Sequence, residues 1–390
     1  MALNTLFQAP GAGGTPAPDG VPFAAVMSDV RAAIAEDLRP HLSKIDVEGW
    51  YPKPFMQRLG AVGGYAQAVP AEYGGAGRGL PYTLHVMEEV SQDDLSTGFC
   101  VWCQTVCAWY IQTSDNDILK QTLLPRVARG ELLGGTGLSN PMKHFAGIEK
   151  MRLTATRRPG GYSLAGALPW VSNVAVDHVF AAVAKIAGED GYLMAIIPGD
   201  SKGLTLGDGG HFIALEGSST HNAVFRDVFV SEDFVLASPC HDYITRIRPG
   251  FILGQTGFGL GLVSSCLDLM RRSNERVGHV NCFLQDGVAE IEADLEETRR
   301  RVYPLAEAIG CGRRTLPPEA MREAVQARAL TSELALRAAQ AAMLHAGAAG
   351  YRSGSVAERK VRESYFVAVV TPALKHLKKL LHDTSALAPI

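Results

Sequence analysis

The feature that most constrains this chain is a stretch of short strand patterns enclosed by two helical regions. From Gly134 to about residue 240, apolar and polar residues alternate, and turn signals such as Pro159-Gly160-Gly161 separate the runs. Apolar residues recur at helical spacing before this stretch, from Phe23 to about Gly130, and again from about Tyr243 onward. Helices, then strands, then helices indicate an α+β protein.

The same pattern predicts the domain organisation. We expect a helical domain over residues 23–133, a middle β domain over 134–240 and a helical bundle over 241–390. Residues 1–22 are rich in Gly, Pro and Ala and carry almost no charge, so we expect a flexible arm.

Charge and cysteine content narrow the class of protein. A net charge of −3 gives no electrostatic footprint for nucleic acid or an anionic membrane, and no apolar run is long enough to predict a transmembrane helix. Seven cysteines without a recognisable secretory leader predict reduced thiols and a cytoplasmic protein. Cys100, Cys103 and Cys107 recur at helical spacing in an apolar segment, which favours core packing over a metal site.

The stretch from Leu344 to Pro372 combines features of a specialised helix end and a new helix. Small residues over 346–350 precede Tyr351, and a helix with several charged residues then opens at about Glu358. Five other segments also have distinctive sequence patterns. They are GWYPKPFMQRLGAVGGYAQAVPAEYGGAG (49–77), EEVSQDDLSTG (88–98), LLPRVARGELLGGTGLSNP (123–141), GALPWVSN (166–173) and LEGSSTHNAVFRDVFV (215–230).

Taken in order and at their spacing, these six segments resemble the acyl-CoA dehydrogenase family over roughly residues 30–375. The resemblance implies an N-terminal helical domain, a middle β domain and a C-terminal four-helix bundle. It implies FAD rather than FMN, a small-molecule or acyl-thioester substrate, and a homotetramer or dimer whose cofactor site is shared between subunits. An electron-transfer flavoprotein or a flavin reductase is the expected protein partner.

The resemblance also assigns cofactor roles. Trp170 matches the tryptophan beside the flavin ring, and Ser172 the hydroxyl that reaches flavin N5; two residues apart, they would share one face of a regular strand. The remaining matched positions are Leu138 and Ser139 on the pyrimidine side, with Gly347, Gly350 and Arg276 near the pyrophosphate. Three alternatives stay open: Trp170 as core, the glycines as an ordinary helix end, and Arg276 as a solvated charge.

The catalytic carboxylate of the family is missing. In most members a glutamate abstracts the substrate α-proton nine residues after the arginine that here is Arg362, and this position is Thr371, followed by Pro372. The alternative base position of the family falls at about Phe251 and is also apolar. A threonine hydroxyl is no general base at neutral pH. His144 is a candidate replacement, with a surface loop histidine as the alternative.

Three functions therefore remain open. The first is a flavin oxidoreductase that acts on an acyl thioester or a related substrate with another base or none. The second is a flavin-dependent monooxygenase of the same fold, in which reduced flavin reacts with oxygen; such relatives often carry a histidine near the position of the glutamate. The third is a catalytically idle member that keeps the flavin site for structure.

Overall fold

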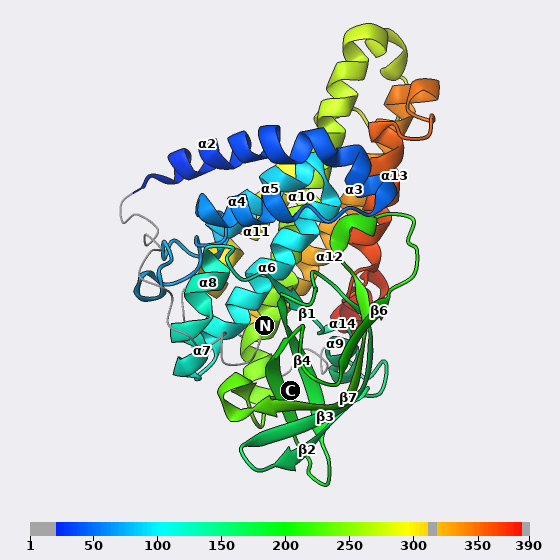
Figure 1. Cartoon of the computed structure of the whole chain (residues 1–390). Helices are drawn as coiled ribbons and strands as arrows, with labels where there is room; N and C mark the ends of the chain where they lie inside the picture. Colours follow the sequence, from blue (N-terminus) through cyan, green and yellow to red (C-terminus); the bar gives the residue numbers. More distant parts are fainter. Residues whose placement is uncertain (1–20, 311–317, 384–390) are drawn as a thin grey trace.

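The computed structural model describes residues 21–310 and 318–383, so the predicted arm lies almost wholly outside the described residues. Within them, helices come first, a sheet follows and helices close the chain (Figure 1). The sheet forms one end of the molecule and the helices the other (Figure 1). This arrangement confirms the predicted α+β class.

The first region is helical. Its α-helices are α2 (Phe23–Ala33), α3 (Leu42–Glu48), α4 (Lys53–Ala61), α5 (Leu80–Asp93), α6 (Leu95–Thr113), α7 (Asp117–Thr122) and α8 (Leu124–Ala128). A π turn (Ile34–Leu38) and a 3-10 turn (Arg39–His41) that contains Pro40 separate α2 from α3. Proline removes a backbone donor and favours such a break.

The middle region is one mixed sheet. Its strands are β1 (Gly134–Thr136), β2 (Leu153–Arg158), β3 (Gly161–Val171), β4 (Val179–Ile186), β5 (Tyr192–Pro198), β6 (Leu204–Asp208), β7 (His221–Ser231) and β8 (Val235–Ala237). They lie in the order β6-β7-β3-β2-β4-β5-β8, with β1 parallel to β4. A short helix, α9 (Ser139–Phe145), follows β1.

The last region is the helical bundle. Its helices are α10 (His241–Asn281), α11 (Val288–Gly310), α12 (Pro318–Ala346), α13 (Val356–Val369) and α14 (Leu374–His382). By length and composition α10 could cross a membrane, but 94% of its most apolar window is buried in the protein. Burial of this kind is typical of the central helix of a bundle.

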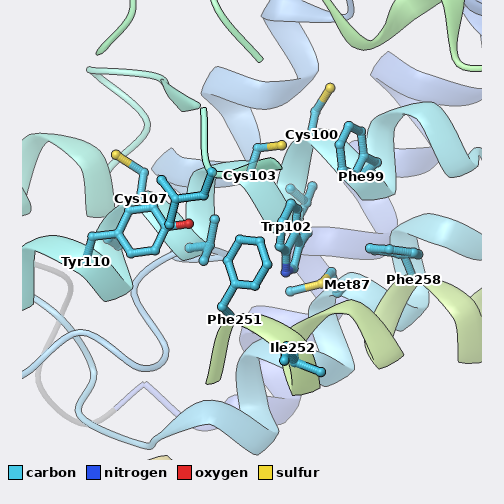
Figure 2. Close-up of a cluster of buried hydrophobic side chains, with 14 of the residues drawn as sticks. Met87, Phe99, Cys100, Trp102, Cys103, Cys107, Tyr110, Phe251, Ile252 and Phe258 are labelled. Carbon is cyan, nitrogen blue, oxygen red and sulfur yellow. The ribbon is translucent and has the colours of Figure 1, made fainter. Parts of the chain in front are cut away.

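An aromatic core joins α6 to α10. Trp102 of α6 packs edge-on against Phe251 of α10, with ring centroids 5.0 Å apart, and stacks with Phe99 at 5.5 Å (Figure 2). Cys100 and Cys103 are fully buried in the same helix, as predicted. The space between these two helices is therefore filled by side chains.

Candidate functional site

The turn between α13 and α14 brings two predicted positions together. Thr371 Oγ1 lies 2.9 Å from the Oγ of Ser139, the first residue of α9. The resemblance placed Ser139 in the cofactor loop and Thr371 at the position of the catalytic base. Residues 232 apart in the sequence thus share a hydrogen bond.

Behind this turn, two buried polar side chains of the bundle hold its backbone. Gln255 of α10 donates from Nε2 to the Thr371 carbonyl over 2.8 Å, and its Oε1 accepts from Arg328 Nε over 2.9 Å. Arg328 also donates to Ser332 Oγ and Val367 O, so these hydrogen bonds all go to uncharged acceptors. Burial lowers the pKa of Arg328 to about 9, and its guanidinium therefore stays charged at neutral pH.

In front of the turn lies a small hollow. Its volume is about 10 Å³, which is room for a single water molecule. It is lined by Met142, Lys143, Ala146, Ile148, Arg248, Ile252, Thr371, Pro372, His376 and Leu380. None of these described residues carries a carboxylate, whereas three of them are basic.

The basic residues of the hollow differ in their surroundings. Burial lowers the pKa of Arg248 to about 10, so it is charged at neutral pH. Lys143 pairs with Glu149 over 3.1 Å. Burial, and then the charges of Lys375 and Lys143, lower the pKa of His376. The Ala373 backbone N–H donates to its Nδ1 over 3.4 Å, which leaves the proton of the neutral ring on Nε2.

Trp170 and Ser172 lie at an irregular end of β3. The ladder between β3 and β7 shifts register between Leu168 and Val171, and Trp170 has a φ of 57°. Trp170 is 52% exposed and donates from Nε1 to Gly209 O, whereas Ser172 is buried. The regular strand assumed from their two-residue spacing is therefore wrong at this point.

Ser172 is hydrogen-bonded to the segment that leads into α9. Its carbonyl accepts from the Thr136 backbone N–H over 3.4 Å, three residues before Ser139. A Cβ on Gly135 would lie 2.3 Å from the same carbonyl, so only glycine permits this approach. Thr220 donates to Ser172 Oγ over 2.9 Å, which leaves the Ser172 proton available to a ligand. Leu138, the other predicted loop residue, is fully buried.

Three predicted cofactor positions lie at the far end of the bundle. Arg276 is exposed near the end of α10, and Gly347, with a φ of 61°, is exposed just after α12. Gly350 is buried at the end of the same turn. Nearby, Ser273 donates to His345 O, which joins the two helices at this end. A single copy of the chain does not bring these residues to Thr371.

His144 does not join the hollow. Its Nε2 lies 2.8 Å from Tyr192 Oη and its Nδ1 lies 3.1 Å from Glu149 O. Its neighbour Phe145 packs edge-on against Tyr192, with ring centroids 5.2 Å apart. In this structure His144 therefore anchors α9 to the sheet.

Known proteins with similar sequences agree with the resemblance described above. The family model described as "Acyl-CoA dehydrogenase, N-terminal domain" matches residues 24–131. The mitochondrial isovaleryl-CoA dehydrogenase of Solanum tuberosum is 26% identical over 300 residues, which cover 71% of this chain and 70% of that protein. Residues 24–131 therefore match an N-terminal domain of the acyl-CoA dehydrogenase family, and over most of its length the chain is similar to proteins named acyl-CoA dehydrogenases.

Solved structures of similar proteins share the fold of this chain. A glutaryl-coenzyme A dehydrogenase, solved as its glutaryl-CoA complex, has a TM-score of 0.84 at 23% identity and covers 94% of this chain and 96% of its own. The FAD complex of PigA has a TM-score of 0.79 at 17% identity, and the match covers 93% of this chain and 97% of that chain. At these identities the likeness concerns the fold.

Sequence reasoning missed four residues around Thr371 in this acyl-CoA dehydrogenase homologue. They are Arg248, Gln255, Arg328 and His376. A polar residue inside an apolar helical run was an available signal for Gln255 and Arg328, because buried polar groups need partners. His376 stands five positions after Thr371, and the turn brings it back to the same hollow.

Proposed function

We propose that this chain is an FAD-dependent oxidoreductase of the acyl-CoA dehydrogenase type that acts on an acyl thioester or a related substrate without a carboxylate at residue 371. Similarity to this family supports the flavin-dependent oxidoreductase class. The observation that carries the finer proposal is the contact between Ser139 and Thr371. The family resemblance assigns Ser139 to the cofactor-binding segment and Thr371 to the position of the base. In this chain both residues carry hydroxyl groups, and neither carries a carboxylate.

The residues present fit a bound flavin. Trp170 offers an aromatic side chain that is 52% exposed, at a backbone conformation rare for a bulky residue. Ser172 offers a hydroxyl proton, and Leu138 and Ser139 lie at the start of helix α9. These four residues would hold the ring of FAD, which supplies a two-electron acceptor when bound.

The surroundings of Thr371 favour binding and charge stabilisation over proton abstraction. A general base must lie within hydrogen-bond reach of the proton that it removes, and no carboxylate is among the described residues that line the hollow. Glu149 lies beyond Lys143 and is also bonded to Asn140. Thr371, Ser139 and His376 instead orient donors, and the basic side chains stabilise negative charge.

The flavin spectrum tests the proposal. We expect purified protein to be yellow with bound FAD and to bleach anaerobically with at least one of a panel of acyl-CoAs. Reoxidation by an electron-transfer flavoprotein would identify the class of electron acceptor. A protein that takes up no added FAD would refute the proposal, and one that binds FAD but responds to no acyl-CoA would refute its substrate class.

One observation favours a second candidate, a flavin-dependent monooxygenase. His376 lines the same hollow as Thr371, which supplies the histidine that the sequence did not show at the glutamate position itself. The test is oxygen consumption by chemically reduced protein with an amine or aromatic substrate. Hydroxylated product formed in proportion to the oxygen consumed would support this candidate, and hydrogen peroxide alone would refute it.

A further inference from the structure

We infer that the substrate of this protein carries its own carboxylate, or a comparable small anionic group, and that the hollow beside Thr371 receives it. This inference rests on the proposed function and names the substrate class of the same site. It is drawn from the charges around Thr371, which lie on both sides of the turn.

On the inner side, a buried positive charge lies behind the turn. Arg328 is fully buried and reaches the Thr371 carbonyl through Gln255. It donates to an amide oxygen, a hydroxyl and a backbone carbonyl, and its guanidinium lies 5.8 Å from the centre of the Phe258 ring. A buried cation with uncharged partners creates a favourable site for a nearby anion, because its field is weakly screened.

On the outer side, the hollow adds more positive charge and several donors. Arg248 is 5% exposed, and Lys143, which also pairs with Glu149 over 3.1 Å, lies on α9 at the edge of the hollow. His376 presents an Nε2–H, and Thr371 a hydroxyl. Cationic donors and hydroxyls are the groups that bind carboxylates in proteins.

The apolar walls and the size of the hollow define the rest of the ligand. Ile252, Leu380, Met142 and Ile148 suit a short aliphatic chain. Between α6 and α10, the space around Trp102 is filled by aromatic side chains (Figure 2). Since the hollow has room for about one water molecule, the side chains that line it must move apart when an acyl group binds. The geometry therefore points to a short acyl group that ends in a carboxylate.

Two thioesters with chains of equal length test the inference. Succinyl-CoA ends in a carboxylate and butyryl-CoA in a methyl group, and their Kd values follow from perturbation of the flavin spectrum in the holoenzyme. We expect succinyl-CoA to bind at least about 10-fold more tightly, in line with a charge-assisted hydrogen bond. Equal affinity, or tighter butyryl-CoA binding, would overturn the inference.

Charge-removing variants locate the binding site. Arg248→Gln and Lys143→Gln should each bring the ratio of the two Kd values close to unity. Lys379→Gln removes the same charge from the exposed side of α14 and should leave the ratio unchanged. Because Arg248 is buried in α10 and its variant can fail to fold, Lys143→Gln on α9 decides the question alone. A ratio that Lys143→Gln does not change would contradict the assignment.

Failure of the proposed function can be distinguished from failure of this inference. If neither thioester binds, the thioester assignment is wrong, and calorimetry with succinate then tests the anion site without CoA. Succinamide, which has the same chain and no charge, is the control. Succinate binding that succinamide does not show, and that Lys143→Gln weakens, would support the inference; equal or absent binding of the two would overturn it.

Discussion

Thr371 is surrounded by groups that would suit a carboxylate at its position. Gln255 links its backbone to the buried cation Arg328, and Arg248 and Lys143 line the hollow in front of it. A carboxyl group introduced here would gain favourable charge interactions, which lower its pKa and keep it ionised. These surroundings therefore suit a glutamate at residue 371.

Thr371→Glu should restore proton abstraction. General bases contribute about 10²–10⁴-fold to such reactions, and we expect anaerobic flavin reduction by acyl-CoA to become at least about 10-fold faster. Stopped-flow measurement of flavin bleaching checks this result. Thr371→Gln has the same shape without the charge and should give no gain. Equal rates in both variants would show that a bound thioester lies out of reach of residue 371.

His178 makes stability depend on pH. It is 3% exposed, its Nδ1 lies 3.1 Å from Asn173 O, and burial lowers its pKa below the usual 6.5. The unfolded chain therefore binds more protons, so this contribution is complete above the unfolded pKa and is lost as pH falls towards the folded one. We expect melting temperatures to fall less steeply below pH 6.5 in His178→Gln than in the unchanged protein.

Two controls belong to this pH prediction. His211→Gln alters an exposed histidine and should leave the slope as it is. Burial also lowers the pKa of His85 and His376, so His178→Gln should reduce the slope without abolishing it. A slope identical to that of the unchanged protein would contradict the role given to His178.

At the level of elements, local pattern predicted much and long-range contact little. The turn at Pro159–Gly161 gives the β2–β3 hairpin with Arg158 opposite Gly161, because turn residues and alternation act over a few positions. The irregular backbone at Trp170 was missed, because β7 and the loop at Gly209 impose it from outside β3. Ser139 and Thr371, which the family resemblance assigned to the cofactor and to the base position, share a hydrogen bond that no local pattern predicts.

The same limit applies to the basic side chains of the hollow. They come from three elements that are far apart in the sequence, namely α9, α10 and α14. Each has an ordinary local environment in the sequence, since His376 lies in a basic helix and Lys143 in a short polar one. Only the packing of α14 against the bundle shows that they share a site.

The joint between α5 and α6 provides a test of element packing. Asp94 caps α6 by accepting from the Thr97 backbone N–H over 2.7 Å, and its other oxygen lies 3.6 Å from Arg359 of α13. The carboxylate is fully buried, and burial followed by the charge of Glu363 raises its pKa. Asp94 therefore couples the N-terminal helices to the bundle.

Asp94→Ala should destabilise the protein strongly. The change removes the cap of α6 and one of the two carboxylates beside Arg359, which keeps Glu363 at 3.8 Å, and loss of a hydrogen bond to a buried charged group costs about 1.5–3 kcal/mol. The shift of the urea unfolding midpoint measures the loss. Asp93→Ala is the matched control, since Asp93 makes a more exposed pair with Arg39 and such pairs contribute about 0–1 kcal/mol. Similar shifts for the two variants would contradict the coupling role of Asp94.

In the whole molecule, one end of the bundle exposes large apolar side chains beside predicted cofactor residues. Phe283 after α10 is 88% exposed and Tyr351 after α12 is 84% exposed. Both segments project together from the body of the molecule (Figure 1). Arg276 and Gly347 lie on the same segments and face no flavin ring in one copy of the chain. Exposed apolar groups of this size indicate an interface.

We therefore predict a homo-oligomer whose assembly completes the FAD site. The double variant Phe283→Asp, Tyr351→Asp should lower the mass measured by sedimentation velocity, because charges would be buried in the contact. If the far end of one copy holds the pyrophosphate of another, the same variant should bind FAD at least about 10-fold more weakly, a loss of about 1.4 kcal/mol. Ile118→Asp changes an exposed apolar residue on α7, at the opposite end of the molecule, and should alter neither property (Figure 1). An unchanged protein that sediments as a monomer and still binds FAD tightly would refute the shared site, since one copy would then hold the whole cofactor.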